Sequence, residues 1–251
     1  MRTRILILLA ALVGMLAPLG AVAPADAATC SDPKFVTSDE NGMWGDGAYI
    51  VHNNMWNSSG YKVSETLKAC SHRNWKVIAK ANNSSGDGAV KTYPNVHRDY
   101  HNWNTGAEPR LSSFKSIRST FAARTPGVGI YNAAYDIWLN GVPGNNEVMI
   151  WTDNHRQVPA GSVVAKGLSF SGHTWRVYAT QDNSYIAFKP SEAITHGTMR
   201  IKPMLQWLVS KGRVRAGSTI GQICYGFEIV STGGDRASFK VNDFSVKSTK
   251  R

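Results

Sequence analysis

The chain has 251 residues and a formal net charge of +11, because 28 Lys and Arg residues outnumber 17 Asp and Glu residues. Such a charge can attract nucleic acid or an anionic surface, but the basic residues are scattered, without a Gly-rich phosphate loop or a recognition-helix pattern. We therefore expect a solvated basic surface and no nucleic-acid partner.

The chain begins with a segment typical of a signal peptide. Residues 1–27 combine an arginine-bearing start, an apolar run that is proline-interrupted and too short to span a bilayer, and the small-x-small end Ala25-Asp26-Ala27. We expect cleavage after Ala27 and a secreted, extracellular, monomeric protein of residues 28–251 with no membrane partner.

Three cysteines follow this segment: Cys30, Cys70 and Cys224. Export permits a disulfide; Cys30 and Cys70 both lie in the N-terminal quarter, whereas Cys224 lies in an apolar segment, where a buried free thiol is usual. We predict a Cys30–Cys70 disulfide, with three reduced and buried thiols as the alternative. No Cys or His falls at zinc-like spacing, so we expect no metal and no other cofactor.

From about Tyr49 onward the sequence consists of short segments of alternating polarity, separated by Gly, Asn, Asp, Ser and Pro. A period of two predicts strands that show one set of side chains to the core and another to the opposite face. Residues 201–214 differ, because Ile201, Leu205 and Leu208 recur at helical spacing. The pattern predicts an antiparallel all-β fold with one helix.

The strand predicted within residues 48–57 places Asn54 and Trp56 on one face. An aromatic platform beside an amide suits a sugar ring, whose C–H face stacks and whose hydroxyls form hydrogen bonds. A tryptophan buried in the core is the alternative. Tyr93, Trp103 and Trp175 are weaker candidates of the same kind.

Two neighbouring segments carry an acid beside a tryptophan. Asp136 and Trp138 share one strand face, and Glu147, Met149 and Trp151 share a face of the next strand. A short polar loop joins the segments, so a hairpin would bring Asp136 close to Glu147. Adjacent carboxylates repel, and one then tends to hold a proton and hydrogen-bond its neighbour. We interpret this face as a cleft floor.

A third acid, Glu228, is predicted to point away from its apolar neighbours Phe227 and Ile229, and Gly226 is expected to leave room for a ligand. An apolar setting disfavours the charged carboxyl, which suits a general acid. Alternatively, each acid pairs with a Lys or Arg at a strand edge. No GxSxG motif occurs, so nothing supports serine hydrolase chemistry.

Six segments, in chain order YIVHNNMWN, TYPNV, AYDIWL, NEVMIW, PAGS and GFEIVSTGG, resemble glycoside hydrolase family 12, from Cys30 to about Val246. The resemblance implies a β-jelly-roll sandwich of two curved antiparallel sheets, one α-helix on the convex side, and a glucan cleft across the concave sheet. It also implies an endo-1,4-β-glucanase, or cellulase, that hydrolyses internal bonds of a β-1,4-glucan polysaccharide with retention, and makes residues 28–251 its catalytic domain.

By this resemblance Glu147 is the expected nucleophile, Glu228 the acid/base, and Asp136 an acid hydrogen-bonded to the nucleophile. A retaining pair requires carboxyl groups roughly 5–5.5 Å apart. The expected substrate-binding residues are the cleft-floor contacts that the resemblance implies and the two tryptophans on the acid-bearing faces: Asn54, Trp56, Met149, Trp138 and Trp151.

Two positions depart from the family pattern: Asn57 follows Trp56 where Gly is usual, and Val230 stands where an aromatic residue is expected. Alternatives are a xyloglucan-specific member of the same family, a xylanase of the related jelly-roll family, and a non-catalytic glucan-binding jelly-roll lectin. The EVMIW strand disfavours the xylanase, whose nucleophile strand typically reads E-Y-Y. For the +11 charge we hypothesise weak adhesion to acidic cell-wall polymers.

Overall fold

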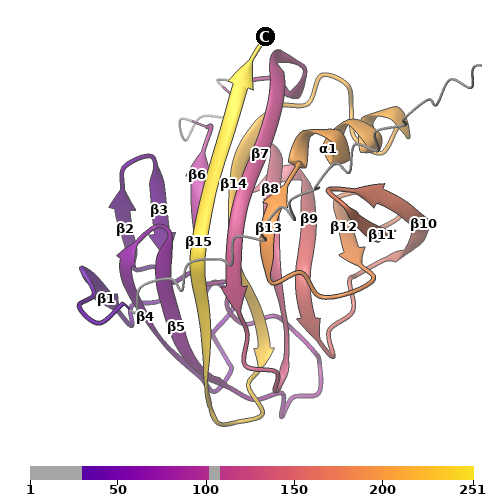
Figure 1. Ribbon diagram of the computed structural model, residues 1–251. Helices are drawn as coiled ribbons and strands as arrows, with labels where there is room; N and C mark the ends of the chain where they lie inside the picture. The colour runs from indigo at the N-terminus through magenta and orange to yellow at the C-terminus, as the bar shows by residue number, and fades with distance from the viewer. Residues whose placement is uncertain (1–29, 102–107) are drawn as a thin grey trace, which may run out of the picture.

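Two β-sheets packed face to face make up the computed structural model, which describes residues 30–101 and 108–251 (Figure 1). The predicted signal peptide and Trp103 lie outside these residues. Within them, no helix is both long and apolar enough to cross a membrane. The predicted all-β sandwich with one α-helix is confirmed.

The larger sheet has nine strands in the order β10-β11-β12-β9-β8-β14-β6-β3-β2. One neighbouring pair departs from the predicted antiparallel arrangement: β10, β11 and β12 form a meander that returns beside β9, and β12 runs parallel to it. The strands are β2 (Met43–Asp46), β3 (Tyr49–His52), β6 (Asn95–Asp99), β8 (Ile130–Gly141), β9 (Gly144–His155), β10 (Ser162–Phe170), β11 (His173–Ala179), β12 (Tyr185–Pro190) and β14 (Ile220–Ser231).

The smaller sheet has six strands in the order β1-β4-β5-β15-β7-β13 and lies nearest the viewer in Figure 1. A short 3-10 turn, η1 (Leu111–Ser113), leads into β7. The strands are β1 (Phe35–Thr37), β4 (Val63–Ser71), β5 (Asn74–Ala81), β7 (Phe114–Arg124), β13 (His196–Met199) and β15 (Arg236–Lys250).

The hydrophobic core fills the space between the sheets. Aromatic rings join the two layers: the Phe227 ring on β14 lies 5.8 Å from that of Trp75 on β5 and 5.3 Å from that of Phe239 on β15. Because alternate side chains of each strand enter this core, the other set on the nine-stranded sheet is left for its concave, outer face.

The predicted helix is α1 (Ile201–Ser210). Its buried apolar residues, among them Met204 and Leu205, belong to the same core cluster as the core-facing side chains of the sheets. The helix ends just before Gly212, whose φ of 68° fits the left-handed conformation common after helices. It therefore lies on the convex side of the nine-stranded sheet, away from the concave face.

A disulfide joins Cys30 to Cys70 on β4, with an S–S distance of 1.98 Å, as predicted. Cys224, on β14, is a buried free thiol, also as predicted. The disulfide ties the segment before β1 to the six-stranded sheet.

Candidate active site

The hairpin of β8 and β9 brings Asp136 and Glu147 to one face of the nine-stranded sheet. Glu147 is the register partner of Trp138, and Asp136 is the partner of Met149, so the two acids lie diagonally across the strand pair. Val148, between Glu147 and Met149, belongs to the core. The predicted assignment of these side chains to a face opposite the core is confirmed.

Glu228 comes from β14, which pairs with β8 on the side away from β9. It lies opposite Asn132 of β8, whereas Glu147 lies opposite Trp138, near the other end of the same strand. Its neighbour Phe227 points into the core, as predicted. Both glutamates nevertheless line one cleft, which indicates that the curvature of the sheet brings their side chains together.

This cleft crosses the concave face between β2 and β9 and has a volume of about 560 Å³. Its lining includes Asp136, Glu147 and Glu228 and four of the predicted contacts, namely Asn54, Trp56, Trp138 and Met149. The side chain of Trp56 is 61 % exposed. An exposed indole in a cleft that also holds acids provides an apolar platform for a ligand with both C–H faces and polar groups.

The two glutamates have strongly perturbed acidities. Burial raises the pKa of Glu147 to about 7, and the nearby charge of Glu228 contributes to that shift. Burial likewise raises the pKa of Glu228 to about 7, although hydrogen bonds from Asn132 and Gln157 oppose the shift. Carboxyl groups that can hold or release a proton near neutral pH are suited to acid–base chemistry.

Asp136 is the most enclosed of the three acids, at 6 % exposure. Burial raises its pKa well above the usual range, and the charges of Glu147 and Glu228 add to the shift, so its neutral form is favoured. Its Oδ1 atom has no hydrogen-bond partner in the described part of the chain. The hydrogen bonds of the structure do not include the predicted one to Glu147; the two acids are coupled through their charges.

Sequence reasoning missed two residues that hold Glu228. The amide of Asn132 donates a short hydrogen bond to Oε2 of Glu228, and Nε2 of Gln157 donates to the same oxygen over 3.3 Å. Asn132 stands four positions before Asp136, so the alternation that placed Asp136 on the concave face could have found it. Gln157 follows the end of β9, and the sequence carries no comparable signal for it.

Asn54 and Trp56 lie in the cleft for a reason other than the one predicted. The strand expected to run through Trp56 ends at His52, because Asn53 is buried with its amide donating to the Asp39 carbonyl, and Asn54 has a φ of 44°. The chain leaves the sheet here and forms a turn beside the cleft. The Asn54 carbonyl accepts a hydrogen bond from the amide of Tyr93, which also lines the cleft.

Three further expectations are not met. Trp151 is 1 % exposed and packs beside Met149, with its Nε1 3.4 Å from the Met149 sulfur, so it supports the cleft floor from outside the lining. Trp175 is fully buried in the core. The space beside Gly226 is filled by the backbone of Pro94, whose carbonyl would lie 2.1 Å from an added Cβ, and therefore does not serve a ligand.

Comparisons with known proteins point to one family of enzymes. Residues 47–248 match the profile of glycosyl hydrolase family 12. Endoglucanase S of Pectobacterium parmentieri is 26 % identical over 216 residues, which cover 76 % of this chain and 79 % of that protein. A probable xyloglucan-specific endo-beta-1,4-glucanase A of Aspergillus fumigatus is 28 % identical over 223 residues, covering 81 % and 89 %.

Among solved structures, the xyloglucanase domain of NopAA from Sinorhizobium fredii, in complex with cellobiose, superposes with a TM-score of 0.75. It is 25 % identical, and the alignment covers 87 % of this chain and all of that domain. An all-β sandwich with carboxyl groups in a concave cleft thus defines a glycoside hydrolase of the jelly-roll class. The chain belongs to glycosyl hydrolase family 12.

Proposed function

We propose that this protein is a retaining endo-β-1,4-glucanase in which Glu147 is the nucleophile and Glu228 the acid/base. The observation that carries the proposal is the joint presence of Glu147 and Glu228 in one cleft, each with its pKa raised to about 7. One relative described above is named an endoglucanase and another a probable xyloglucan-specific endo-beta-1,4-glucanase, which supports the substrate class.

In the first step, protonated Glu228 transfers its proton to the glycosidic oxygen as the bond from that oxygen to the anomeric carbon breaks. The ionised carboxylate of Glu147 forms a bond to the anomeric carbon, giving a glycosyl-enzyme and a free leaving chain. In the second step, Glu228 removes a proton from water, the water oxygen attacks the anomeric carbon, and Glu147 is released. Two displacements restore the original configuration.

The surrounding residues have distinct parts in this scheme. Asn132 and Gln157 hold the carboxyl group of Glu228 in place through their amides. Asp136, in its favoured neutral form, lies beside Glu147 without adding a second negative charge. The exposed Trp56 would stack on a glucosyl ring away from the reacting bond.

The first test replaces each glutamate with its uncharged isostere. Glu147→Gln and Glu228→Gln should fold normally and lose at least about a thousandfold in kcat on a soluble neutral β-glucan, since acid–base catalysis alone contributes 10²–10⁴-fold. The matched control is Asp235→Asn, which removes one carboxylate from an exposed position that lines neither the catalytic cleft nor the hollow beside it. If either cleft variant keeps the rate of this control, the role given to that glutamate is wrong.

A second test separates the two roles. An aryl cellobioside with a good leaving group needs no proton from Glu228, so Glu228→Gln should still release the aryl group whereas Glu147→Gln should not. The opposite pattern would exchange the assignments.

Reducing-sugar release by the wild-type protein also decides against a glucan-binding lectin without catalysis, which would bind the polymer and leave its length unchanged.

The names of the relatives suggest two classes of substrate for this chain, general β-1,4-glucans and xyloglucan. The exposed Trp56 accommodates an unsubstituted glucosyl ring face, which supports cellulose-type or mixed-linkage chains as substrates. An activity panel on carboxymethylcellulose, mixed-linkage glucan and xyloglucan, with products separated by chain length, tests this. Exclusive cleavage of xyloglucan would favour the alternative.

The proposal extends to the location of the enzyme. Residues 1–27 would direct export and be removed, leaving 28–251 as the secreted, monomeric catalytic domain. Terminal sequencing of protein collected outside the producing cells should begin at Ala28. A chain that keeps residues 1–27 would contradict this.

A further inference from the structure

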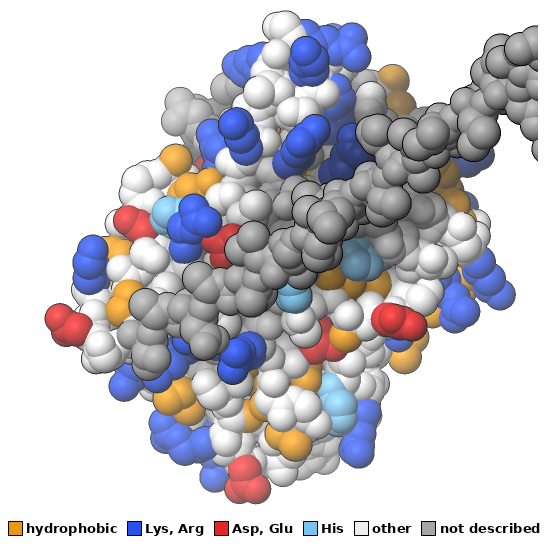
Figure 2. Space-filling view, viewed as in Figure 1, with side chains coloured by type: hydrophobic (Ala, Val, Ile, Leu, Met, Phe, Trp, Pro, Cys, Tyr) orange, Lys and Arg blue, Asp and Glu red, His pale blue; other side chains and the backbone are white. Residues whose placement is uncertain are grey.

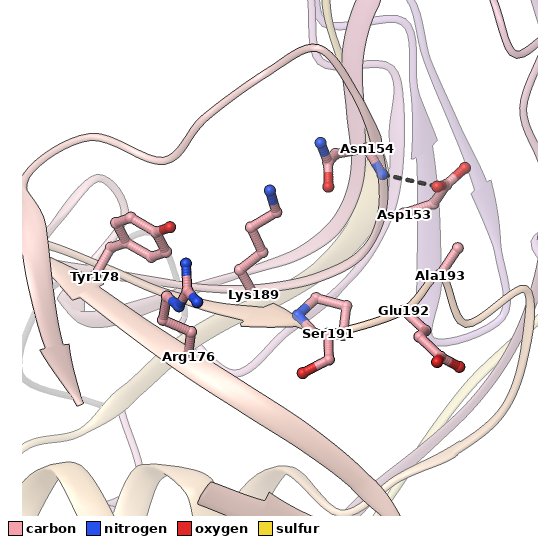
Figure 3. A pocket seen from close by; sticks show the side chains of 9 residues that line it. Asp153, Asn154, Arg176, Tyr178, Lys189, Ser191, Glu192 and Ala193 are labelled. Atoms are coloured by element: carbon pink, nitrogen blue, oxygen red, sulfur yellow. Dashed lines mark hydrogen bonds between the residues drawn. The ribbon is translucent and has the colours of Figure 1, made fainter. Parts of the chain in front are cut away.

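A second hollow lies on the same sheet, beyond the catalytic cleft. It has a volume of about 340 Å³ and is lined from β9, β11, β12 and the segment after β12 (Figure 3). In the order of the nine-stranded sheet, the catalytic cleft extends from β2 to β9 and this hollow from β9 to β11, so β9 is the strand they share. We call it the β11–β12 pocket.

Four side chains of this pocket belong to the concave face. Arg176 and Lys189 are register partners on β11 and β12, and their strand neighbours Val177 and Phe188 are in the core. Tyr178 follows on the same face of β11, and Asn154 is the partner of Asn132, which carries Glu228's hydrogen bond. Figure 3 shows the polar ends of Asn154, Lys189, Arg176 and Tyr178 directed to the same side of the pocket.

Arg176 and Lys189 form a cross-strand pair of like charge, an arrangement that destabilises a sheet. Within the residues that the structure describes, neither side chain makes an ion pair or a hydrogen bond. Two cations without an ion-pair partner and a phenol thus present hydrogen-bond donors to one small hollow. Such a set matches an anion with several acceptor oxygens.

The two acids of the pocket do not neutralise these cations. A β-bulge at Thr152 makes Asp153 the partner of Ala133, a core-side residue, so Asp153 turns toward the other sheet. There its carboxylate accepts hydrogen bonds from the Thr125 hydroxyl at 2.6 Å and from the backbone N–H of Asn154 at 2.8 Å. Glu192 lies after β12, and in Figure 3 its carboxylate points away from the Lys189 ammonium group.

The pocket adjoins the side of the catalytic centre where the leaving group departs. Glu228 would protonate the leaving oxygen, and Gln157 donates to Glu228. The amide of Asn154 in turn donates to the backbone carbonyl of Gln157 over 3.1 Å. A glucan that crosses the strands from Trp56 past Glu228 continues toward β12 and β11.

From these contacts we infer that the β11–β12 pocket binds a carboxylate carried by the leaving-group half of the glucan, through Arg176 and Lys189. The enzyme would therefore cleave a glucan bearing acidic substituents in preference to a neutral one of equal length. Arg176 presents a planar fork suited to two carboxylate oxygens, and Lys189 supplies a second positive charge. This inference rests on the proposed function, since it assumes that the glucan is cut beside Glu228.

The test compares an acidic with a neutral substrate. The double variant Arg176→Gln/Lys189→Gln should lower kcat/KM on carboxymethylcellulose by about tenfold, as expected for loss of charge-assisted hydrogen bonds. It should leave kcat/KM on hydroxyethylcellulose unchanged. The leaving-group half of a cut chain carries the new non-reducing end. In mass spectra of wild-type products, carboxymethyl groups should therefore lie preferentially near new non-reducing ends, and the variant should lose this bias.

The matched control removes the same two charges from another cross-strand pair. Lys247 and Arg118 are exposed register partners on β15 and β7 of the six-stranded sheet, so Arg118→Gln/Lys247→Gln changes net charge equally and leaves the pocket intact. The inference is overturned if the control lowers the acidic-to-neutral ratio as much as the pocket variant, or if neither changes it. If the wild-type protein hydrolyses neither polymer, the proposed function itself fails.

Discussion

At the scale of single residues, the site is defined by three carboxyl groups that burial and mutual repulsion make hard to ionise together. Asp136 favours its neutral form, while Glu147 and Glu228 both titrate near pH 7. One proton shared by the two glutamates gives the ionised nucleophile and the protonated acid that the first step requires. The roles then follow from which carboxyl faces the anomeric carbon, because the two acidities are alike.

This electrostatic coupling yields a prediction for the pKa of Glu147. The charge of Glu228 raises that pKa, so Glu228→Gln, which cannot ionise, should lower it from about 7 by favouring the charged form of Glu147. Carbon-13 NMR of the labelled Glu147 carboxyl, followed from pH 3 to 9, measures the shift. A value unchanged or higher in the variant would contradict the coupling.

At the scale of elements, the β8–β9 hairpin and β14 show what the sequence could predict. Period-two alternation placed Asp136, Glu147 and Glu228 on the concave face, and the short loop between the two acid-bearing segments indicated the hairpin. The alternation of polar and apolar residues involves only near neighbours in the chain, so it can be recognised in a single sequence. The register of β14 against β8, which sets how far Glu228 lies from Glu147, depends on contacts between segments far apart in sequence.

Other features of the site depend on where a strand ends or bulges, which the alternation of polar and apolar residues does not predict. The strand β3 ends at His52, since the buried Asn53 and the left-handed Asn54 divert the chain, yet Trp56 still reaches the cleft. The bulge at Thr152 reverses which side chains face the concave surface, and places Asn154 there in preference to Asp153. Each involves only one or two residues, yet each changes which side chains line one side of the site.

A buried glutamate on β4 makes a prediction for stability. Glu65 is 4 % exposed; its Oε2 accepts a hydrogen bond from the Thr92 hydroxyl at 2.8 Å, and its Oε1 has no partner within the described residues. Burial raises its pKa from 4.5 to about 8. Because the folded state favours the proton, the stabilising contribution is complete below pH 4.5 and is lost as the pH rises through 8.

Glu65→Gln, which stays neutral, should therefore be more stable than the wild type at pH 8–9 by roughly 3–5 kcal/mol, because each unit of the rise in the Glu65 pKa corresponds to about 1.4 kcal/mol. The difference should shrink toward pH 4.5. Urea unfolding of both proteins from pH 4 to 9 measures it; the cleft acids are present in both and cancel. A constant difference across this range would show that Glu65 does not titrate in the fold.

At the scale of the whole molecule, part of the +11 charge is organised on the face opposite the cleft. Register pairs Lys68 with Lys76, Lys76 with Lys240, and Lys240 with Arg124, which places one cation on each of β4, β5, β15 and β7. We call these four residues the basic row. Figure 2, viewed from the side of the six-stranded sheet, shows Lys and Arg side chains spread across this face.

The basic row predicts salt-sensitive adhesion to acidic polymers. Strands spaced about 4.8 Å apart hold the four charges in a line across the sheet, which can contact several carboxylates of one acidic chain. Binding to immobilised polygalacturonate should be measurable at low salt and weaken strongly above physiological ionic strength, where screening shortens to about 8 Å or less. Arg124→Gln/Lys240→Gln should reduce retention on this polymer and leave hydrolysis of neutral glucan unchanged; salt-independent retention would contradict the idea.

The central claim is that Glu147 attacks the sugar and forms a covalent intermediate. A cellobioside with fluorine at carbon 2 and a good leaving group slows the second step more than the first, so the glycosyl-enzyme should accumulate. We predict loss of activity together with a mass increase of one fluorinated cellobiosyl group, mapped by peptide sequencing to Glu147. Labelling of Glu228 or another residue, or hydrolysis without any adduct and with inverted configuration, would contradict the account.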